Sequence, residues 1–426
     1  MKKFFFILIN IFVIISISKA QLTANGNYKI YSIYRGIDYI IVFENIDNTT
    51  EISFNGTGVN WYKFSDPTKS ISNLSSFSPE DNTGYILKAD GVEKTFWVFN
   101  YQNYKPKSIT LLPEIAPEIQ CKNLKINLVT DIPVMRYFTR ENIAYTIERS
   151  FNLSYKTLEW SENSWKNKDI SVSFILTKDE IQVEEAPLCD TQFTITGDQF
   201  ATDLNLNPVN FTSPLYSAVA VACKITTAST ERVEKNEAER PDKTSVTGSA
   251  PLDIFFQSNG NVPVATFYKW SIFKENQLLI NRTDQDIRNT FVNPGTYKVL
   301  LKVSNEYCTF SDSTTISVST SALQVPNVFT PNGDGLNDEF RVAYKSLKSF
   351  QCWVYNRWGR KVYYWSDPQK GWDGKIGGKN AAPGAYFYVI KAYGTDFNPD
   401  TERDKLTRRR VGEYLLKGDI NLLRGL

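Results

Sequence analysis

The chain has 426 residues, of which 42% are hydrophobic and 14% aromatic, so we expect several packed domains. The chain has 48 Lys and Arg residues and 46 Asp and Glu residues. This near-neutral balance lacks the excess of positive charge that nucleic-acid binding requires. The chain has no histidine, which excludes Ser-His-Asp and Cys-His catalysis and ordinary histidine-ligated zinc or iron sites. Carboxylate-pair chemistry, lysine chemistry and oxygen-ligated calcium remain open.

The N-terminus has the pattern of a secretory signal. Lys2 and Lys3 precede an apolar run at residues 4–17, and the small residue Ala20 ends the segment. The run is short for a bilayer span, although a transmembrane anchor is the alternative. We predict that residues 1–20 are a signal peptide. The next residue is glutamine rather than cysteine, so a lipoprotein anchor is not expected.

Five cysteines follow the signal, and an exported chain can oxidise them. Three of them, Cys121, Cys189 and Cys223, could share one domain, while Cys308 and Cys352 lie further along. The odd number and the spacing leave the connectivity open, with free buried thiols as the alternative.

The first two domains are predicted from short strands with turn clusters between them. Residues 21–112 alternate polar and apolar side chains, as in Tyr28–Tyr34, and Trp61 resembles the core tryptophan of an immunoglobulin-like sandwich. A proline-containing linker near 112–117 separates this domain from a second sandwich at 113–243. The charged residues 229–244 could be a linker, but we favour a solvated strand and turn.

The third domain, residues 244–320, resembles a PKD domain, a small immunoglobulin-like sandwich of exported bacterial proteins. The resemblance rests on residues 248–254, on Trp270, and on residues 293–305, which begin with the turn Asn293-Pro294-Gly295. The acidic turn that the family places after the tryptophan is missing here, because Ser271-Ile272-Phe273-Lys274 follows Trp270.

The strongest motifs are five spaced blocks within residues 321–426. They span residues 325–340, which include PNGDGLND, 354–362, which include NRWG, 371–375 (GWDGK), 383–390 (PGAYFYVI) and 416–424, which begin with LKGDI. Their set and order closely resemble the gliding-motility-associated C-terminal domain, the type B sorting domain of the type 9 secretion system of Bacteroidota. The residues that carry the motif are Pro331, Asn332, Gly333, Asp334, Gly335, Asn337, Asp338, Asn356, Arg357, Trp358, Gly359, Trp372, Asp373, Gly374, Gly384, Tyr386 and Gly418.

The resemblance implies export through the periplasm and display at the outer membrane. Type B domains are associated with PorP/SprF-type outer-membrane partners and need not be cleaved after export. The residues themselves suggest one possible ligand. One loop contains four oxygen-bearing side chains that could bind calcium, those of Asn332, Asp334, Asn337 and Asp338. The alternative is a turn in which these side chains cap the backbone.

Three further parts of this domain have testable interpretations. Asn356–Gly359 predicts a tight turn, with Trp358 partly covering the core, and direct partner contact as the alternative. Along 386–390, Tyr386, Tyr388 and Ile390 should share one face while Phe387 and Val389 share the other. The insertion between 393 and 412 reads as a solvated loop, although Arg408-Arg409-Arg410 could contact acidic lipopolysaccharide.

We therefore expect an all-β protein of tandem immunoglobulin-like sandwiches that ends in a small β-sandwich sorting domain. The function expected is a non-enzymatic surface protein with a structural, adhesive or secretion-sensing role. The alternative is a carbohydrate-binding or adhesin module that uses the immunoglobulin-like and PKD-like domains to bind surface polysaccharide. A two-carboxylate glycosidase is the third candidate, and no recognisable pair of catalytic carboxylates supports it.

Overall fold

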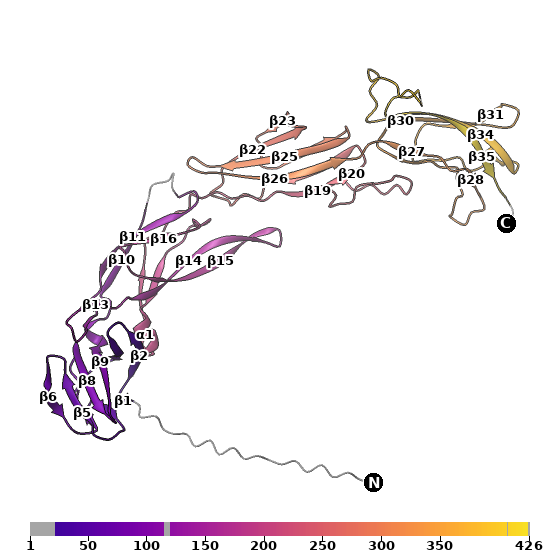
Figure 1. Ribbon diagram of the computed structural model, residues 1–426. Coiled ribbons are helices and arrows are strands. Elements are labelled where there is room, and N and C mark those ends of the chain that lie inside the picture. The colour runs from indigo at the N-terminus through magenta and orange to yellow at the C-terminus, as the bar shows by residue number, and fades with distance from the viewer. Residues whose placement is uncertain (1–21, 115–119, 407, 425–426) are drawn as a thin grey trace, which may run out of the picture.

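The computed structural model describes residues 22–114, 120–406 and 408–424. Nearly all of its regular structure is β, and four sandwiches follow one another along an elongated, bent chain (Figure 1). The prediction of an all-β protein built from tandem sandwiches is confirmed. The predicted signal peptide lies outside the described residues. Within those residues, no helix has the length and apolar character that a membrane span requires.

The first domain packs a six-stranded sheet, β2-β3-β9-β8-β5-β6, on a three-stranded sheet, β1-β4-β7. Its elements are β1 Leu22–Ala24, β2 Tyr28–Tyr34, β3 Ile37–Phe43, β4 Ile52–Phe54, β5 Asn60–Lys63, β6 Asp66–Ser72, β7 Ser76–Phe77, β8 Thr83–Ala89, β9 Val92–Asn100 and the 3-10 turn η1 Tyr101–Asn103. As predicted, Trp61 is buried between the sheets. Its indole N–H donates to the carbonyl of Leu74 at 2.9 Å, which satisfies the polar atom of this core side chain.

The second domain consists of a three-stranded sheet, β10-β11-β16, and a four-stranded sheet, β15-β14-β17-β18. Its elements are β10 Ser108–Pro113, β11 Leu124–Asp131, β12 Arg136–Phe138, β13 Ala144–Thr146, β14 Ser150–Ser161, β15 Ser164–Ile175, β16 Glu180–Val183, β17 Thr194–Gly197, α1 Gln199–Asp203 and β18 Val209–Thr212. The boundary predicted between 112 and 113 is wrong, because β10 pairs with β11 along its whole length. Pro113 is tolerated since β10 is an edge strand.

The third domain pairs a three-stranded sheet, β19-β21-β24, with a five-stranded sheet, β20-β26-β25-β22-β23. Its strands are β19 Thr226–Ser229, β20 Thr247–Gly248, β21 Leu252–Gln257, β22 Phe267–Lys274, β23 Gln277–Arg282, β24 Ile287–Phe291, β25 Gly295–Ser304 and β26 Thr309–Val318. Trp270 is fully buried in the core. The domain begins before the predicted residue 244, because β19 pairs with β21 and completes the smaller sheet.

The fourth, C-terminal domain is built on the five-stranded sheet β28-β35-β34-β30-β31 with two short hairpin pairs beside it. Its strands are β27 Ala322–Gln324, β28 Val328–Phe329, β29 Ala343–Lys345, β30 Leu347–Tyr355, β31 Lys361–Trp365, β32 Lys375–Ile376, β33 Lys379–Asn380, β34 Gly384–Gly394 and β35 Glu413–Leu422. The chain's last described strand, β35, pairs with both β34 and β28. The C-terminal end of the chain therefore closes the sheet that carries most of the predicted motifs.

The joint between the first and second domains contains a buried ion pair. The Arg149 guanidinium contacts the Asp198 carboxylate, and both side chains are almost fully buried. Tyr101 of the first domain donates its hydroxyl to Asp198 at 2.8 Å, and Arg149 donates to the Tyr104 carbonyl at 3.1 Å. Burial lowers the pKa of Arg149 to about 10, so it keeps its charge at neutral pH. A shared apolar cluster that includes Phe99 and Phe200 surrounds the pair, so the two domains form one packed unit.

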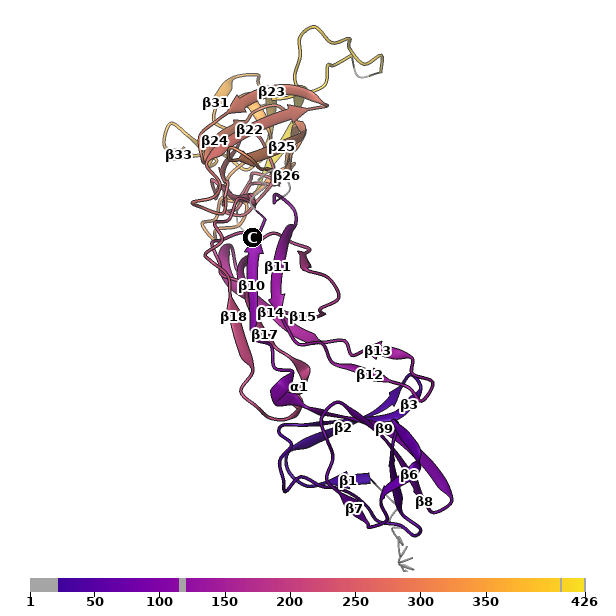
Figure 2. The ribbon, with the colours of Figure 1, turned by 90° about the vertical axis from the view of Figure 1, so that its left-hand side faces the viewer.

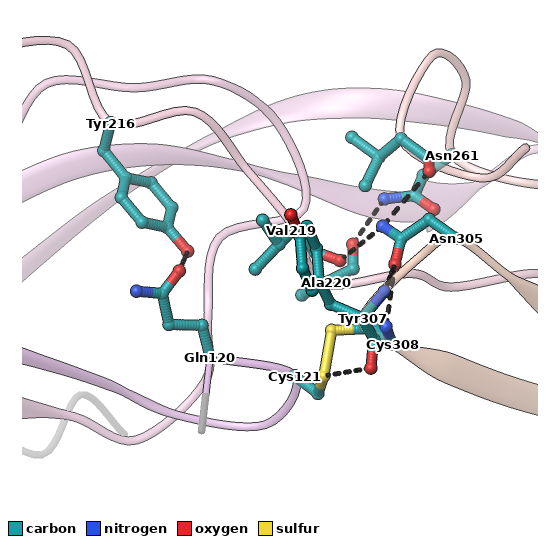
Figure 3. Close-up of a disulfide and its surroundings, with 10 residues drawn as sticks. Gln120, Cys121, Tyr216, Val219, Ala220, Asn261, Asn305, Tyr307 and Cys308 are labelled. Atoms are coloured by element: carbon teal, nitrogen blue, oxygen red, sulfur yellow. Dashed lines mark hydrogen bonds between the residues drawn. A yellow bond between two sulfur atoms is a disulfide. The ribbon is translucent and has the colours of Figure 1, made fainter. Parts of the chain in front are cut away.

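The joint between the second and third domains is covalent. Cys121, which precedes β11, forms a disulfide with Cys308, which precedes β26. Figure 3 shows the disulfide beside two asparagines whose amides point at the segment that connects the domains. Asn261 donates to the carbonyls of Ala220 and Leu188, both at 2.9 Å, and Asn305 donates to Val219 at 2.9 Å. These contacts fix the connecting segment against both domains.

The first three cysteines do not share one domain, contrary to the arrangement that we considered from the sequence. Cys121 and Cys189 lie in the second domain, but Cys223 packs in the core of the third. Cys189, Cys223 and Cys352 are free thiols. Desolvation raises the pKa of Cys223 to about 12, so this thiol stays protonated and unreactive at neutral pH.

The charged segment after β19 forms the joint between the third and fourth domains. Its Asn236 and Ala238 exchange backbone hydrogen bonds with Tyr344 of the C-terminal domain, at 3.0 and 2.8 Å. The Glu237 carboxylate between them is buried and accepts two guanidinium hydrogen bonds from Arg232, at 2.9 and 2.8 Å. Most charged residues of the segment are exposed, as the prediction of a solvated strand and turn expects, but Glu237 is buried where the segment meets the C-terminal domain.

Candidate functional site

The loop between β28 and β29 holds the first predicted motif, and its side chains satisfy its own backbone. Asp338 accepts the amides of Gly333 and Gly335 at 2.6 and 2.8 Å, one on each carboxylate oxygen. Asp334 accepts the amide of Leu336 at 2.7 Å and the Asn332 side chain at 2.8 Å. Both glycines have positive φ values, 87° and 84°, a conformation that glycine adopts without steric cost.

This geometry favours the capped turn over the calcium site that the same residues could form. All four carboxylate oxygens of Asp334 and Asp338 already accept hydrogen bonds inside the loop. The Asn332 hydrogen bond lowers the pKa of Asp334. Asn337 contributes its backbone carbonyl, which accepts the amide of Thr330 at 2.8 Å. Across the described residues, no group of three or more Cys, Asp or Glu side chains could hold a metal ion.

The tryptophan of the third block is the centre of the C-terminal core. Trp372 is fully buried, and its indole N–H donates to the carbonyl of Lys375 at 2.8 Å. Tyr386 packs edge-on against it with ring centroids 5.0 Å apart. Asp373 accepts the amide of Lys375 at 3.0 Å, which holds the turn at that place. These three motif residues therefore stabilise the domain rather than present a surface.

The glycines of the motif allow close approaches between segments. At Gly374, where φ is 69°, a Cβ would lie about 3 Å from Pro331 and from Arg424. At Gly418 of β35 a Cβ would meet the Tyr388 ring, whose hydroxyl would lie 2.7 Å away. Gly384 begins β34 with a φ of 133° and open space around it. Side chains at the first two positions would displace packed neighbours, which explains the residue type there.

Arg424 ends the closing motif block, and it has a structural role that the sequence pattern did not predict. Its guanidinium donates to the carbonyls of Gly374 at 2.8 Å and of Pro331 and Ala381 at 3.3 Å. Arg424 thus ties two motif blocks and the segment between the third and fourth blocks together. Its place in the closing block was the available signal, since an arginine can join several carbonyls with its five donors.

The turn between β30 and β31 is confirmed, but its tryptophan does not cover the core. Asn356 accepts the amides of Trp358 and Arg360 at 3.1 and 3.0 Å, and its carbonyl accepts the amide of Gly359 at 2.9 Å. Trp358 is 76% exposed, because the turn projects beyond the sheet. The Arg357 guanidinium lies 4.6 Å from the centroid of its ring, a cation–π contact. The expected core contact of Trp358 is wrong.

The outward face of the five-stranded sheet is unusually apolar. As predicted, Tyr386 and Ile390 point into the core, whereas Phe387 and Val389 are exposed on the opposite face. Val389 pairs across the sheet with Trp353, whose ring lies 5.5 Å from that of Tyr364. Four neighbouring strands thus present aromatic and aliphatic side chains to solvent.

The insertion between β34 and β35 is a loop outside regular structure, as expected. Arg410 donates to the Thr401 carbonyl at 2.9 Å, and its amide donates to Glu413 at 3.0 Å. Leu406 is almost fully exposed. The basic end of the loop is therefore anchored to its own domain.

These features define a protein of four tandem β-sandwiches whose last domain combines a self-capped loop, a tryptophan-centred core and an exposed aromatic face. Residues 323–405 match the family described as CHU_C Type IX secretion signal domain, and residues 114–213 match the family described as Fibronectin type III domain. The first match implies export to the cell surface or the extracellular space. No curated protein matches the chain.

Several solved structures align with long stretches of this chain, at low sequence identity and low TM-score. Sidekick-1 immunoglobulin domains 1-5 are 10% identical with a TM-score of 0.25, and the match covers 95% of this chain and 81% of that one. Three N-terminal domains of the bacteriophage RB49 Highly Immunogenic Outer Capsid protein (Hoc) are 12% identical with a TM-score of 0.20, covering 74% and 99%. Escherichia coli alpha-2-macroglobulin activated by porcine elastase is 8% identical with a TM-score of 0.18, and the match covers 93% of this chain and 44% of that one.

Proposed function

We propose that this protein is a non-enzymatic spacer, exported through the periplasm by a type 9 secretion system and held at the outer membrane by its C-terminal domain. The signal-like N-terminus supports the first export step, and the match of residues 323–405 supports the second. A PorP/SprF-type outer-membrane protein is the partner we propose for attachment. We further propose that the third domain is a PKD-like sandwich, from its residues 248–254 and 293–305.

The joints carry the spacer part of the proposal. A buried ion pair and a disulfide hold the first two joints, and the third is held by the backbone hydrogen bonds of Asn236 and Ala238 to Tyr344 and by the Lys345–Glu239 ion pair. Flexible linkers would let each domain move independently, whereas these contacts hold the first domain at a set position relative to the C-terminal domain. In Figure 2 the first domain lies at the lower end with the second domain above it, and the third and fourth domains overlap at the top. Such an arrangement suits a structural or adhesive element that presents its N-terminal end away from the membrane.

Deletion of residues 321–426 tests the sorting part of the proposal. We expect the truncated protein to accumulate in the periplasm, because it lacks the secretion signal. The measurement is the fraction of protein that protease digests on intact cells, together with the fraction in the medium. A matched control keeps the C-terminal domain and carries Trp61→Ala, which disturbs only the first domain. Surface exposure of the truncated chain would overturn the proposal.

One observation favours carbohydrate binding as a second candidate function. A cleft of about 530 Å³ lies where the first two domains meet, and its lining includes Arg35, Tyr137, Tyr145, Glu148 and Gln199. The rings of Tyr137 and Tyr145 stack with centroids 5.5 Å apart. Aromatic rings and polar groups together suit a sugar. Binding of the full chain to a glycan array, lost in Tyr145→Ala, would support this function, and no binding to any glycan would overturn it.

A further inference from the structure

We infer that the outward face of the sheet β31-β30-β34-β35, together with the Trp358 turn, docks on an integral outer-membrane protein that presents apolar side chains bordered by carboxylates. This inference rests on the proposed attachment at the outer membrane and names the surface that performs it. The residues that carry it are Trp353, Trp358, Tyr364, Phe387 and Val389, with Leu415 beside them.

The apolar part of this docking face runs across the three strands β31, β30 and β34, and Lys417 of β35 comes next in the row. Tyr364, Trp353 and Val389 lie in one row, since the register pairs Tyr364 with Trp353 and Trp353 with Val389. In the next row Tyr355 pairs with Phe387, which is 45% exposed. Monomeric proteins expose single apolar side chains widely, but contiguous apolar patches mark interaction sites. The contiguity therefore points to a partner.

The turn beside the face is built to hold its tryptophan outward. The three hydrogen bonds to Asn356 fix the backbone of the turn, and the Arg357 guanidinium covers one side of the Trp358 ring. Tryptophan and arginine are the residue types most enriched where binding energy concentrates in protein interfaces. In Figure 1 the connection between β30 and β31 lies at the end of the chain of domains that is farthest from the first domain. A partner there would not collide with the spacer.

The charges around the face select the chemistry of that partner. Lys391 and Lys417 pair in register with Leu415 and Val389 of the face, and Lys361 pairs with Tyr355. Arg357 and Arg360 lie in the turn. Within the described part of the chain these five cations take part in no ion pair. Two carboxylates lie among the paired residues of the face: Asp419, and Glu413, which is buried and accepts the amide of Arg410 at 3.0 Å. A complementary surface is therefore apolar at its centre and acidic at its rim.

The side chains favour a protein over an anionic glycan or lipid. Val389, Leu415 and Phe387 carry no polar group, so they would leave the hydroxyls of a sugar without hydrogen-bond partners. An anionic headgroup would use the cations but not the aliphatic centre. A protein surface satisfies both, with apolar side chains in the middle and charges around them.

The test uses the full chain in the bacterium that exports it. Lys391→Glu combined with Lys417→Glu reverses two exposed charges of the docking face, and Lys298→Glu combined with Lys302→Glu reverses two exposed charges on β25 of the third domain as the matched control. Two quantities are measured: the fraction of protein exported, and the fraction of exported protein that sediments with outer membranes. We expect both variants to be exported as efficiently as the unaltered chain. For the face variant alone, the fraction of exported protein that sediments with outer membranes should fall about tenfold, which corresponds to the loss of one good charge interaction.

Retention of the face variant equal to that of its control would overturn the inference while leaving the proposed export intact. Accumulation of the face variant in the periplasm would also overturn it, because the face would then serve translocation. A photo-cross-linking residue at position 389 of the full chain identifies the partner class, with position 302 as control. Cross-links to an integral outer-membrane protein from position 389 alone support the inference, and cross-links only to lipopolysaccharide contradict it. If the unaltered chain is exported but never retained, the proposed attachment fails as well.

Discussion

Cys121 of the second domain and Cys308 of the third are joined by a disulfide across 187 residues of sequence. The bond closes the joint that Asn261 and Asn305 also hold through the connecting segment. The disulfide and the asparagine hydrogen bonds therefore stabilise the same joint. The joint is consequently fixed in the oxidising compartments that an exported chain meets. Its geometry should be retained when either the disulfide or the asparagine hydrogen bonds alone are removed.

Replacing both partners, Cys121→Ser with Cys308→Ser, is expected to lower the free energy of unfolding by about 2–4 kcal/mol, because the unfolded chain regains the freedom of a long loop. Chemical denaturation of the full chain measures this. The radius of gyration in solution should stay unchanged, since the asparagine hydrogen bonds remain. Cys189→Ser, at a free thiol, is the control. Equal denaturation midpoints for the double variant and the unaltered chain would contradict the prediction.

Asp198→Ala is expected to destabilise the joint of the first two domains by about 3–5 kcal/mol, because it leaves the buried Arg149 charge without its partner. It also removes the side chain that caps α1 through the amides of Phe200 and Ala201. The measurement is thermal unfolding of the full chain. Glu159→Ala removes one member of an exposed pair with Lys168 and should change stability by less than about 1 kcal/mol. Similar losses in both variants would show that burial is not the cause.

Asp338→Ala is expected to lower stability by about 1 kcal/mol, because the amides of Gly333 and Gly335 lose the carboxylate that accepts them. A calcium chelator should leave the melting temperature of the unaltered chain unchanged, since the loop is satisfied by its own hydrogen bonds. The experiment compares melting with calcium and with chelator, in the unaltered chain and in Asp334→Ala. A chelator-induced drop that disappears in Asp334→Ala would mean that the loop binds calcium.

The Asp253–Arg288 pair of the third domain predicts a dependence of stability on acid pH. The hydrogen bond from Arg288 lowers the pKa of Asp253 to about 2, from an ordinary value of 3.8. The folded state therefore holds this carboxylate ionised where the unfolded chain would protonate it. The stabilisation is present above about pH 4 and is lost as the pH falls toward 2.

Arg288→Ala should raise the pKa of Asp253 toward its ordinary value and reduce the loss of stability between pH 4 and pH 2. Titration of the Asp253 carboxyl by NMR and denaturation at several pH values measure the two effects. The pair is partly exposed, so high salt should weaken the difference. A control, Lys166→Ala, removes an exposed cation of the second domain and should leave the titration of Asp253 unchanged. Identical pH profiles for Arg288→Ala and the unaltered chain would contradict the assignment.

The local architecture was predictable because it depends on local patterns. Alternation of side chains with a period of two predicted the strands of all four domains, and it also placed Phe387 and Val389 on the face opposite Tyr386. The turn at Asn356–Gly359 followed from residue types that tolerate tight backbone geometry. The order of the C-terminal motifs predicted the secretion signal that residues 323–405 match. The strand faces and the turn depend on a few neighbouring residues, whereas the secretion signal depends on the order of blocks along the C-terminal domain.

Tertiary structure alone decided which residues meet between domains. Cys121 pairs with Cys308, and the charged segment around Glu237 becomes a buried joint, through contacts that no spacing in the sequence specifies. Trp358 illustrates the same limit, since its residue type favours a core and only the projection of its turn beyond the sheet exposes it. The sequence determined sandwiches, turns and an export signal, because short-range sterics and hydrophobic periodicity set these. The fixed joints and the exposed docking face depended on how finished domains pack, because burial and charge pairing there arise between residues far apart in the chain.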